Sequence, residues 1–390
     1  MEKIVSLGKI ILSKLEEFGY EAYFVGGFVR DLLLNKKSDD IDITTNALPE
    51  TVEKLFDKTI ATGKKYGTVT VFIEDEKFEV TTYRVEKDYL NHRRPESVLY
   101  TNHLEEDLKR RDFTINALAM DRFDKIIDLF QGQADLNNKL IRAIGNPDER
   151  FNEDALRMLR AIRFVSKLGF SVEEKTAESI RNNIEKISHL SNERVLVEFK
   201  KIFKNSYNKE ALKVMENLNV AEIFREFNQG IRVYNNSNYE LNFIEFFTMS
   251  LFLENAVIPD YWRLSNYDRL MISTILEILY KVRDNGFTPY IVYSYGLSKS
   301  LSANRVRLVL YNSPSEEFSI KTIFNNLVIK KRSDLKINGS IIKKNIKNIE
   351  PKKIGNLIME IEYHVVNNLL KNDELDLIKY ARNKLENING

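Results

Sequence analysis

The feature that most constrains this chain is a pair of glycines between a predicted strand and a predicted helix, with two aspartates in the next predicted strand. Apolar residues predict a strand over Ala22–Val25, and the segment after Gly26 and Gly27 predicts a short helix over Val29–Leu34. A second strand is expected over Asp40–Thr44. Glycines at such a turn let backbone N–H groups approach a polyphosphate closely, because no Cβ stands in the way.

Asp40 and Asp42 are two residues apart in the second predicted strand, so both carboxylates are expected on one face of the sheet. Two such carboxylates repel each other unless they hold cations. Mg²⁺ prefers oxygen ligands and commonly bridges carboxylates to substrate phosphates. Either motif alone is common as a purely structural feature. Together they predict metal-assisted nucleotidyl transfer, with Mg²⁺ as cofactor and both aspartates as its catalytic ligands.

Length and composition bound the class of protein. A chain of 390 residues is too long for one typical core. The net charge of +2 means that any nucleic-acid site must be a local patch. The absence of cysteine excludes disulfides and agrees with a reducing cytosol. The first residues predict an amphipathic helix and not a signal peptide, and no apolar run reaches membrane-spanning length, so we expect a soluble cytoplasmic protein.

The first part of the chain alternates predicted helices and strands. Strand patterns over Thr68–Ile73 and Phe78–Val85 are joined by a polar connection that predicts a hairpin. Glu79 lies in the second strand and is a candidate third acidic ligand if it points toward the paired aspartates; an exposed strand glutamate is the alternative. The polar segment Asp88–Pro95 predicts either a loop that closes over a bound substrate or a solvated loop.

A basic cluster, Lys109–Arg111, is predicted to lead directly into a strand. From there one arginine of the cluster can reach phosphates near the paired aspartates, and Asp112 and Asn116 are expected to orient groups at the same place. Solvated charge clusters of this kind are also common, so the cluster alone does not decide the function.

The segment Glu153–Leu168 predicts a helix that is apolar nearly all round, which is typical of a buried helix. Between positions 155 and 165 its only polar residues are Arg157, Arg160 and Arg163. A guanidinium group does not lose its charge on burial, so these residues need anionic partners. A triphosphate together with Asp154 would serve, and ion pairs between neighbouring helices are the alternative. Arg157 and Arg160 are expected to share a helical face with Asp154, whereas Arg163 lies half a turn away.

These motifs together resemble those of the class II tRNA nucleotidyltransferases. The matching phrases are G-G-x-V-R-D-L-L-L followed by D-x-D-I-T, then R-R-D-F-T-x-N-A, then E-D-A-L-R-M-L-R-A-I-R-F, and finally E-R-x-x-x-E at Glu193, Arg194 and Glu198. The family includes CCA-adding enzymes, CC- and A-adding specialists and bacterial poly(A) polymerases. The segment Asp88–Pro95 is similar to the flexible loop of CCA-adding enzymes, which CC-adding relatives are expected to lack.

The resemblance implies an α+β N-terminal nucleotidyltransferase head with a mixed, polymerase-beta-like sheet, followed by an all-α neck, body and tail. The implied boundaries are 1–145 for the catalytic head, 146–220 for the neck that recognises base and nucleotide, and 221–390 for the body and tail that bind tRNA. Glu193, Arg194 and Glu198 are expected to brace the base-binding helix.

The predicted C-terminal part is helical and rich in lysine and asparagine. Lys330–Lys353 holds nine basic residues, a patch that suits an RNA backbone or is only a solvated surface. Asp334–Gly339 resembles the tail of Bacillus-type enzymes. The four histidines are scattered and none precedes an aspartate, which argues against an appended phosphohydrolase domain.

The resemblance also implies roles for particular residues. Asp154 with Arg157 would read the base, and the triphosphate or ribose would be held by Gly27, Arg30, Arg111, Arg160 and Arg163. Cytosine and adenine present an amino donor beside a ring-nitrogen acceptor, whereas uracil and guanine present the reverse. An aspartate that only accepts and an arginine that only donates therefore match C and A.

The implied reaction is template-independent addition of C, C and A to the 3′ end of tRNA from CTP and ATP, with release of pyrophosphate, in tRNA maturation and repair. An A-adding specialist and a poly(A) polymerase are the alternatives within the family. A non-catalytic RNA-binding or nucleotide-sensing module is the alternative outside it, and the paired aspartates argue against that class. The expected partners are tRNA, CTP and ATP, with no membrane, and a homodimer is left open.

Overall fold

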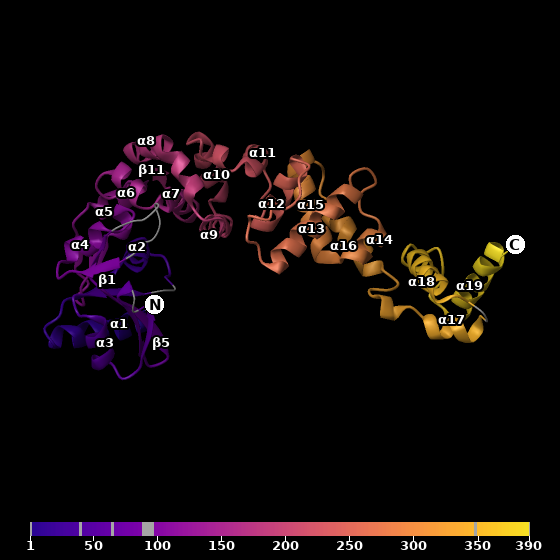
Figure 1. Cartoon of the computed structure of the whole chain (residues 1–390), viewed down its shortest axis with the longest axis horizontal. Coiled ribbons are helices and arrows are strands. Elements are labelled where there is room, and N and C mark those ends of the chain that lie inside the picture. Colours follow the sequence, from indigo (N-terminus) through magenta and orange to yellow (C-terminus); the bar gives the residue numbers. More distant parts are fainter. Residues whose placement is uncertain (1, 39–40, 64–65, 88–96, 347–348, 390) are drawn as a thin grey trace. The chain divides into compact units, whose positions relative to one another are not determined.

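The computed structural model describes residues 2–38, 41–63, 66–87, 97–346 and 349–389. The chain forms two compact units, Met1–Arg225 and Glu226–Gly390. Strands occur in the first unit, and the elements described in the second unit are helices (Figure 1). None of the helices in the described ranges combines the length and hydrophobicity that a membrane crossing requires.

A seven-stranded mixed sheet forms the N-terminal part of the first unit. Its strand order is β3-β4-β5-β2-β1-β8-β9. The central strand β1 (Ala22–Val25) pairs antiparallel with β2 (Asp42–Thr45), which pairs in parallel with β5 (Glu76–Thr82). The other strands are β3 (Thr59–Gly63), β4 (Thr68–Ile73), β8 (Leu118–Met120) and β9 (Ile126–Asp128). Two strand pairs lie outside this sheet, namely β6 (Arg84–Lys87) with β7 (Ser97–Tyr100), and β10 (Leu140–Ile141) with β11 (Ser171–Val172).

The strand predictions succeed where one pattern corresponds to one strand. The strands at 22–25 and 68–73 have the predicted bounds, and the predicted hairpin joins β4 to β5. The single strand predicted over Phe78–Val85 is wrong. It divides at Tyr83, because β5 pairs with β2 and β4 whereas β6 pairs with β7. The strand predicted over Asp40–Thr44 corresponds to β2, which begins at Asp42 and ends at Thr45. Asp40 lies outside the described residues.

Helices cover the sheet. The predicted N-terminal amphipathic helix is α1 (Glu2–Glu17), which buries Leu7, Ile11 and Leu15. It packs on β1, β2 and β5, and α3 (Pro49–Leu55) packs beside it. The helix after the glycine turn, α2 (Gly27–Leu33), begins two residues earlier than predicted, and Gly26 is its N-cap. Its buried residues include Arg30 and Asp31, which are the charged groups closest to the turn in sequence.

The rest of the first unit is mainly helical. Its central helix, α7 (Leu156–Leu168), buries most of its residues and packs against α9 (Asn192–Phe203) and α10 (Asn208–Asn217). The other elements are α4 (Leu104–Lys109), η3 (Thr114–Asn116), α5 (Gly132–Asn137), α6 (Pro147–Glu153), α8 (Glu174–Asn183), η4 (Ile184–His189) and η5 (Val220–Ile223). The expected burial of the arginine-bearing helix is confirmed.

The single helix predicted over Glu153–Leu168 is wrong at its start. The chain leaves helical geometry at Asp154, whose φ and ψ are −146° and 104°, so α6 ends and α7 begins there. The Asp154 side chain accepts a hydrogen bond from the backbone N–H of Leu156 at 3.0 Å. Such a bond satisfies one of the amide groups that the first turn of a helix leaves unpaired, which favours a break at this residue.

The second unit contains two groups of packed helices. One has an aromatic core in which the ring of Phe227 contacts those of Phe246, Phe247 and Trp262. The other has an aliphatic core that includes Ile361 and Leu377. The helices are α11 (Arg225–Asn235), α12 (Phe243–Leu253), α13 (Asn266–Lys281), α14 (Pro289–Tyr295), α15 (Leu297–Tyr311), α16 (Glu317–Asn326), η6 (Arg332–Asp334), α17 (Gly339–Asn345), α18 (Pro351–Val366) and α19 (Glu374–Asn389). The finer division at positions 145 and 220 stays a prediction.

Candidate active site

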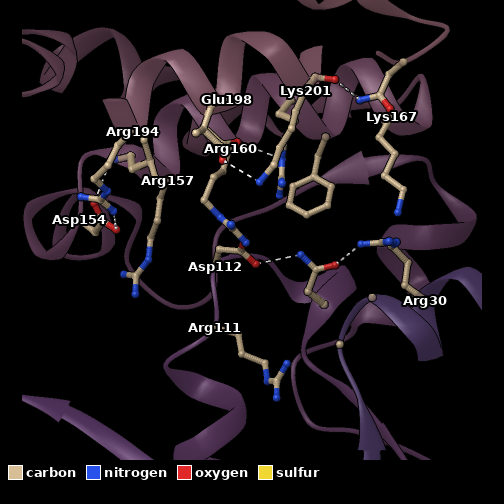
Figure 2. Close-up of a pocket in the computed structure, with 18 of the residues that line it drawn as sticks. Arg30, Arg111, Asp112, Asp154, Arg157, Arg160, Lys167, Arg194, Glu198 and Lys201 are labelled. Atoms are coloured by element: carbon tan, nitrogen blue, oxygen red, sulfur yellow. Dashed lines mark hydrogen bonds and ion pairs between the residues drawn. The ribbon is translucent and has the colours of Figure 1, made fainter. Parts of the chain in front are cut away.

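A cavity of about 1000 Å³ opens in the first unit between the glycine turn and helices α7 and α9 (Figure 2). Its volume suits a nucleotide-sized ligand, and arginine and lysine outnumber aspartate and glutamate in its lining. The cavity brings together the described residues of the predicted site, which are Gly27, Arg30, Asp42, Arg111, Asp154, Arg157, Arg160 and Arg163. Asp40 lies outside the described residues. The role of each residue as a ligand stays a prediction.

The glycine turn brings a cation and an anion close together. Gly26 has a φ of +72°, a conformation that favours glycine. A Cβ at this position would lie 2.9 Å from Nη1 of Arg111 and 3.6 Å from Oδ2 of Asp42. A side chain at Gly26 would therefore both strain the turn and displace Arg111 from the wall of the cavity.

Asp42 is the first residue of β2, and it lines the cavity beside the glycine turn. The parallel register pairs Asp42 with Glu79 of β5, so the two side chains leave the same face of the sheet. Glu79 is exposed and its role as a third ligand stays a prediction. In the described ranges no group of three or more His, Cys, Asp or Glu residues is arranged to hold a metal ion. The oxygen donors of Asp42 and Glu79 nevertheless fit the ligand preference of Mg²⁺.

Asp107 on α4 holds both arginines of the basic cluster, and the sequence reasoning missed it. Its carboxylate is fully buried and accepts from Nε of Arg110 at 2.9 Å and from Nη2 of Arg111 at 3.3 Å. Burial raises the pKa of this carboxyl, but the two guanidinium groups outweigh the burial and hold the pKa below its ordinary value. The available signal was an acidic residue three and four positions before two arginines, which is the spacing of contacts along a helix.

The prediction that the basic cluster leads directly into a strand is wrong. A turn and the short helix η3 intervene, and β8 begins only at Leu118. Asp112 causes the turn, because its Oδ1 accepts from the backbone N–H of Phe113 and from Nδ2 of Asn116, both at 2.9 Å. Side chains that bond to the nearby backbone in this way compete with strand pairing.

Asp112 and Asn116 orient arginines from two different elements. Asn116 accepts from Nη1 of Arg30 at 2.5 Å, and Asp112 accepts from Nε of Arg160 at 2.7 Å. Burial raises the pKa of Asp112, but Arg160 and Asn116 together hold it well below its ordinary range. Asp112 is therefore an anion that fixes the direction of Arg160. Asp112 and Asn116 thus orient two arginines that line the cavity, and that these arginines bind a nucleotide stays a prediction.

Asp154 and Arg157 lie on the cavity wall but not on one helical face, and that part of the prediction is wrong. Asp154 precedes α7, and its Oδ2 accepts from Nη2 of Arg194 on α9 at 2.7 Å. Arg157 is buried and donates to the carbonyl oxygens of Arg110 at 3.1 Å and Arg150 at 3.0 Å, and also to the Glu153 carboxylate. In Figure 2 the Arg157 side chain extends from α7 into the cavity.

The other arginines of α7 also have acidic partners, which is the alternative that the sequence left open. Arg160 pairs with Asp112, and Nε of Arg163 lies 3.1 Å from Oε2 of Glu198 on α9. The ring of Phe164 stacks beneath the Arg163 guanidinium, with 4.7 Å from Cζ to the ring centroid. Burial and the neighbouring Arg160 lower the pKa of Arg163, and Glu198 opposes that shift. The helix thus carries internally paired arginines that also line the cavity.

Of the three residues predicted to brace the base-binding helix, Arg194 and Glu198 of α9 contact its two ends, whereas its role in binding the base stays a prediction. Arg194 holds Asp154 at the start of α7, and Glu198 holds Arg163 one turn before its end. Glu198 is almost fully buried, and Nζ of Lys201 lies 3.6 Å from its other oxygen. Two contacts from one helix therefore fix the direction of α7 along the cavity.

Three family models match successive parts of the chain. The Poly A polymerase head domain matches residues 22–142. The Probable RNA and SrmB-binding site of polymerase A matches residues 169–230, and the tRNA nucleotidyltransferase domain 2 model matches residues 250–381. Together with the mixed sheet and the cavity beside its glycine turn, these matches define the class of the protein as a nucleotidyltransferase with a poly(A)-polymerase-type head.

Whole-chain comparisons give a narrower result. The CCA-adding enzyme of Lactobacillus johnsonii is 38% identical over 380 residues, covering 95% of each chain. That of Staphylococcus haemolyticus is 36% identical and covers 98% of this chain and 99% of its own. The crystal structure of the Bacillus stearothermophilus CCA-adding enzyme in complex with CTP superposes with a TM-score of 0.85 at 32% identity, covering 99% and 98% of the two chains. The chain belongs to the family of the CCA-adding enzymes. The α+β head and helical remainder implied by the sequence motifs are confirmed.

Proposed function

We propose that this chain adds C, C and A to the 3′ end of tRNA without a nucleic-acid template, using CTP and ATP and releasing pyrophosphate. The observation that carries the proposal is the joint placement of Asp154 and Arg157 on the wall of a cationic cavity whose other side holds the glycine turn and Asp42. The cavity thus combines groups for base selection with groups for phosphate binding.

Base selection needs no template strand if protein groups read the base. The carboxylate of Asp154 is tied to Arg194 and to the start of α7, yet its oxygens have further acceptor capacity for an amino group of C or A. Arg157 is held by carbonyl oxygens and supplies only donors, which suit a ring nitrogen. An incorrect base would leave buried polar groups unpaired, at a cost of about 1–3 kcal/mol each.

Phosphate binding is supported by the opposite side of the cavity. Backbone N–H groups at Gly27 begin α2, where a helix N-terminus favours an anion. Arg111 lies against the same turn, and Arg30, Arg160 and Arg163 add positive charge in the lining. In the proposed assignment these groups hold the triphosphate and ribose so that the α-phosphate lies near Asp42.

The proposed cofactor is Mg²⁺. Asp42 and Asp40 would hold it, with Glu79 beside Asp42 in the strand register. When bound, Mg²⁺ lowers the pKa of the attacking 3′-hydroxyl and stabilises the leaving oxygen of pyrophosphate. The protein's own contribution is to orient the nucleotide through Asp154, Arg157 and the arginines of α7, since positioning alone supplies a large part of such catalysis.

The second unit is proposed to bind tRNA. Within Lys330–Lys353, exposed lysines lie before α17, at Lys336, and in its last turn, at Lys343 and Lys344, where they would neutralise backbone phosphates. The cytoplasm, where we expect the protein, holds its proposed substrates. The predicted loop Asp88–Pro95 lies outside the described residues, and a homodimer stays open.

The experiment that tests the proposal uses purified protein and tRNA that lacks its 3′ end. Labelled CTP and ATP are supplied separately and together, and the products are resolved at single-nucleotide length. We expect two additions with CTP alone and three with both nucleotides. Addition of A only to a primer that already ends in CC would identify an A-adding specialist, and long A tails a poly(A) polymerase. No incorporation in the presence of Mg²⁺ would support a non-catalytic module. An Asp42→Asn variant is the control for contaminating activity.

A further inference from the structure

A closed circuit of side chains links two positions on α7 through the floor of the cavity. It starts at Arg160 of α7 and ends at Lys167 of the same helix. Between them it passes, in order, through Asp112, Asn116, Arg30 and Asp31. Arg30 donates from Nε to Asp31 at 2.8 Å, and Nζ of Lys167 lies 3.0 Å from the other oxygen of Asp31. The circuit joins α2, which follows the glycine turn, to α7, which carries the arginines of the cavity.

Asn116 is the one uncharged member of this circuit. It is only 6% exposed, and its neighbours on the two sides have opposite charges. Oδ1 accepts from Arg30 at 2.5 Å, whereas Nδ2 donates to Asp112 at 2.9 Å. A primary amide presents an acceptor and a donor on one short side chain. A carboxylate would repel Asp112, and an apolar group of the same size would leave both charged neighbours without this partner.

We propose that Asn116 is a positioning residue that sets Arg30 and Arg160 in fixed relation to each other, so that both can hold one nucleotide at the same time. Arg30 stands beside the phosphate-binding turn and Arg160 on the helix that is proposed to carry the base-reading group. The inference rests on the proposed function for the identity of the ligand, CTP or ATP. Asn116 itself need not touch the nucleotide.

A merely structural role would make a different prediction. If Asn116 only stabilised the fold, its replacement would lower the melting temperature without changing nucleotide affinity in the folded protein. A matched comparison is available in Asn304 of α15, which is 2% exposed, accepts from the backbone N–H of Glu316 at 3.2 Å and lies in the other unit. Asn304→Leu should lower the melting temperature but leave the Kd for CTP unchanged.

The test is a double-mutant cycle in which the amide and the carboxylate exchange places. Asn116→Asp should weaken CTP and ATP binding by about 5- to 100-fold, because two carboxylates then face each other in a buried site. Asp112→Asn should also weaken binding, because Arg160 loses its anion. The double variant Asp112→Asn with Asn116→Asp restores one carboxylate and one amide between the same two arginines. We expect its affinity to exceed that of Asn116→Asp alone.

Calorimetric Kd values for CTP and ATP and melting temperatures are measured for wild type, both single variants of the cycle, the double variant, Asn116→Leu and the control Asn304→Leu. The proposal is overturned if the change in binding free energy of the double variant equals the sum of the changes in the two single variants. It is also overturned if Asn116→Leu lowers the melting temperature but leaves the Kd unchanged. If the leucine variant does not fold, the cycle of isosteric exchanges still decides. Nucleotide binding is measured without tRNA, so failure of the wild type to extend tRNA would reject the proposed function without deciding the role of Asn116.

Discussion

Asp154→Asn is the substitution that tests base reading most directly, because it changes hydrogen-bond polarity and not shape. In the structure Oδ1 accepts from the Leu156 amide at 3.0 Å and Oδ2 accepts from Arg194 at 2.7 Å. The Leu156 amide requires an acceptor, so the asparagine oxygen is expected to stay with it and the NH₂ group to replace Oδ2. That NH₂ group then faces Arg194 and the cavity as a donor.

The magnitude follows from the number of mismatched groups. An amino group of C or A that meets the new NH₂ has no acceptor, and an unpaired buried donor costs about 1–3 kcal/mol. This corresponds to a decrease of about 5- to 150-fold in kcat/KM for CTP and ATP. A carbonyl oxygen of U or G would meet a donor instead, so kcat/KM for UTP and GTP should stay constant or rise relative to the correct nucleotides. The loss of the Arg194 ion pair affects all four nucleotides and cancels in the ratio.

The assay measures kcat/KM for all four nucleoside triphosphates on a tRNA that lacks its terminal nucleotides. Arg194→Gln is the matched control, because it removes the partner of Asp154 and keeps the carboxylate. The control should lower all four values together. If Asp154→Asn also lowers all four equally and keeps full discrimination against UTP and GTP, Asp154 does not read the base. It would then be a residue that starts α7 and pairs with α9.

Three further predictions test the metal ligand, the glycine turn and the lysine-rich surface of the second unit. Asp42→Asn should abolish incorporation of both C and A at saturating Mg²⁺ with tRNA affinity unchanged, and substantial turnover in a primer-extension assay would reject the metal assignment. Gly26→Ala should lower the melting temperature, since φ 72° with ψ −133° is a backbone conformation nearly restricted to glycine and costs another residue about 1–3 kcal/mol. It should also raise KM, because its Cβ would lie 2.9 Å from Nη1 of Arg111. Gly19→Ala is the control, because Gly19 also has a positive φ, +84°, but nothing lies within 4 Å of its Cβ position. It should lower only the melting temperature, and an equal effect on KM would contradict this reasoning. Three exposed lysines, Lys336, Lys343 and Lys344, are replaced by alanine in the third prediction. The slope of log K for tRNA binding against log salt concentration should become shallower by about 0.7–0.9 for each phosphate that the variant no longer neutralises. An unchanged slope would identify a solvated surface.

The local sequence pattern was sufficient to predict the strand, the glycine turn and the helix that form the first part of the site. The strand at 22–25, the glycine turn and the helix after it follow from apolar runs on either side of residues that tolerate unusual backbone angles. The buried character of α7 follows from its composition, because a helix that is apolar nearly all round has no face suited to water. The motif resemblance extended this to the family, which the whole-chain comparisons confirm.

The details of the site required tertiary contacts. Asp154 breaks the helix through a local bond to the Leu156 amide, but its ion pair with Arg194, forty residues away, is one that no local period reveals. The partners that Arg160 and Arg163 find on other elements and the central place of Asn116 have the same origin. Sequence periodicity specifies which side chains face inward, because burial repeats with the geometry of each helix or strand. Only the packing of separate elements specifies which inward-facing charges meet, because ion pairs and hydrogen bonds form across distances in sequence that the pattern of a single element does not contain.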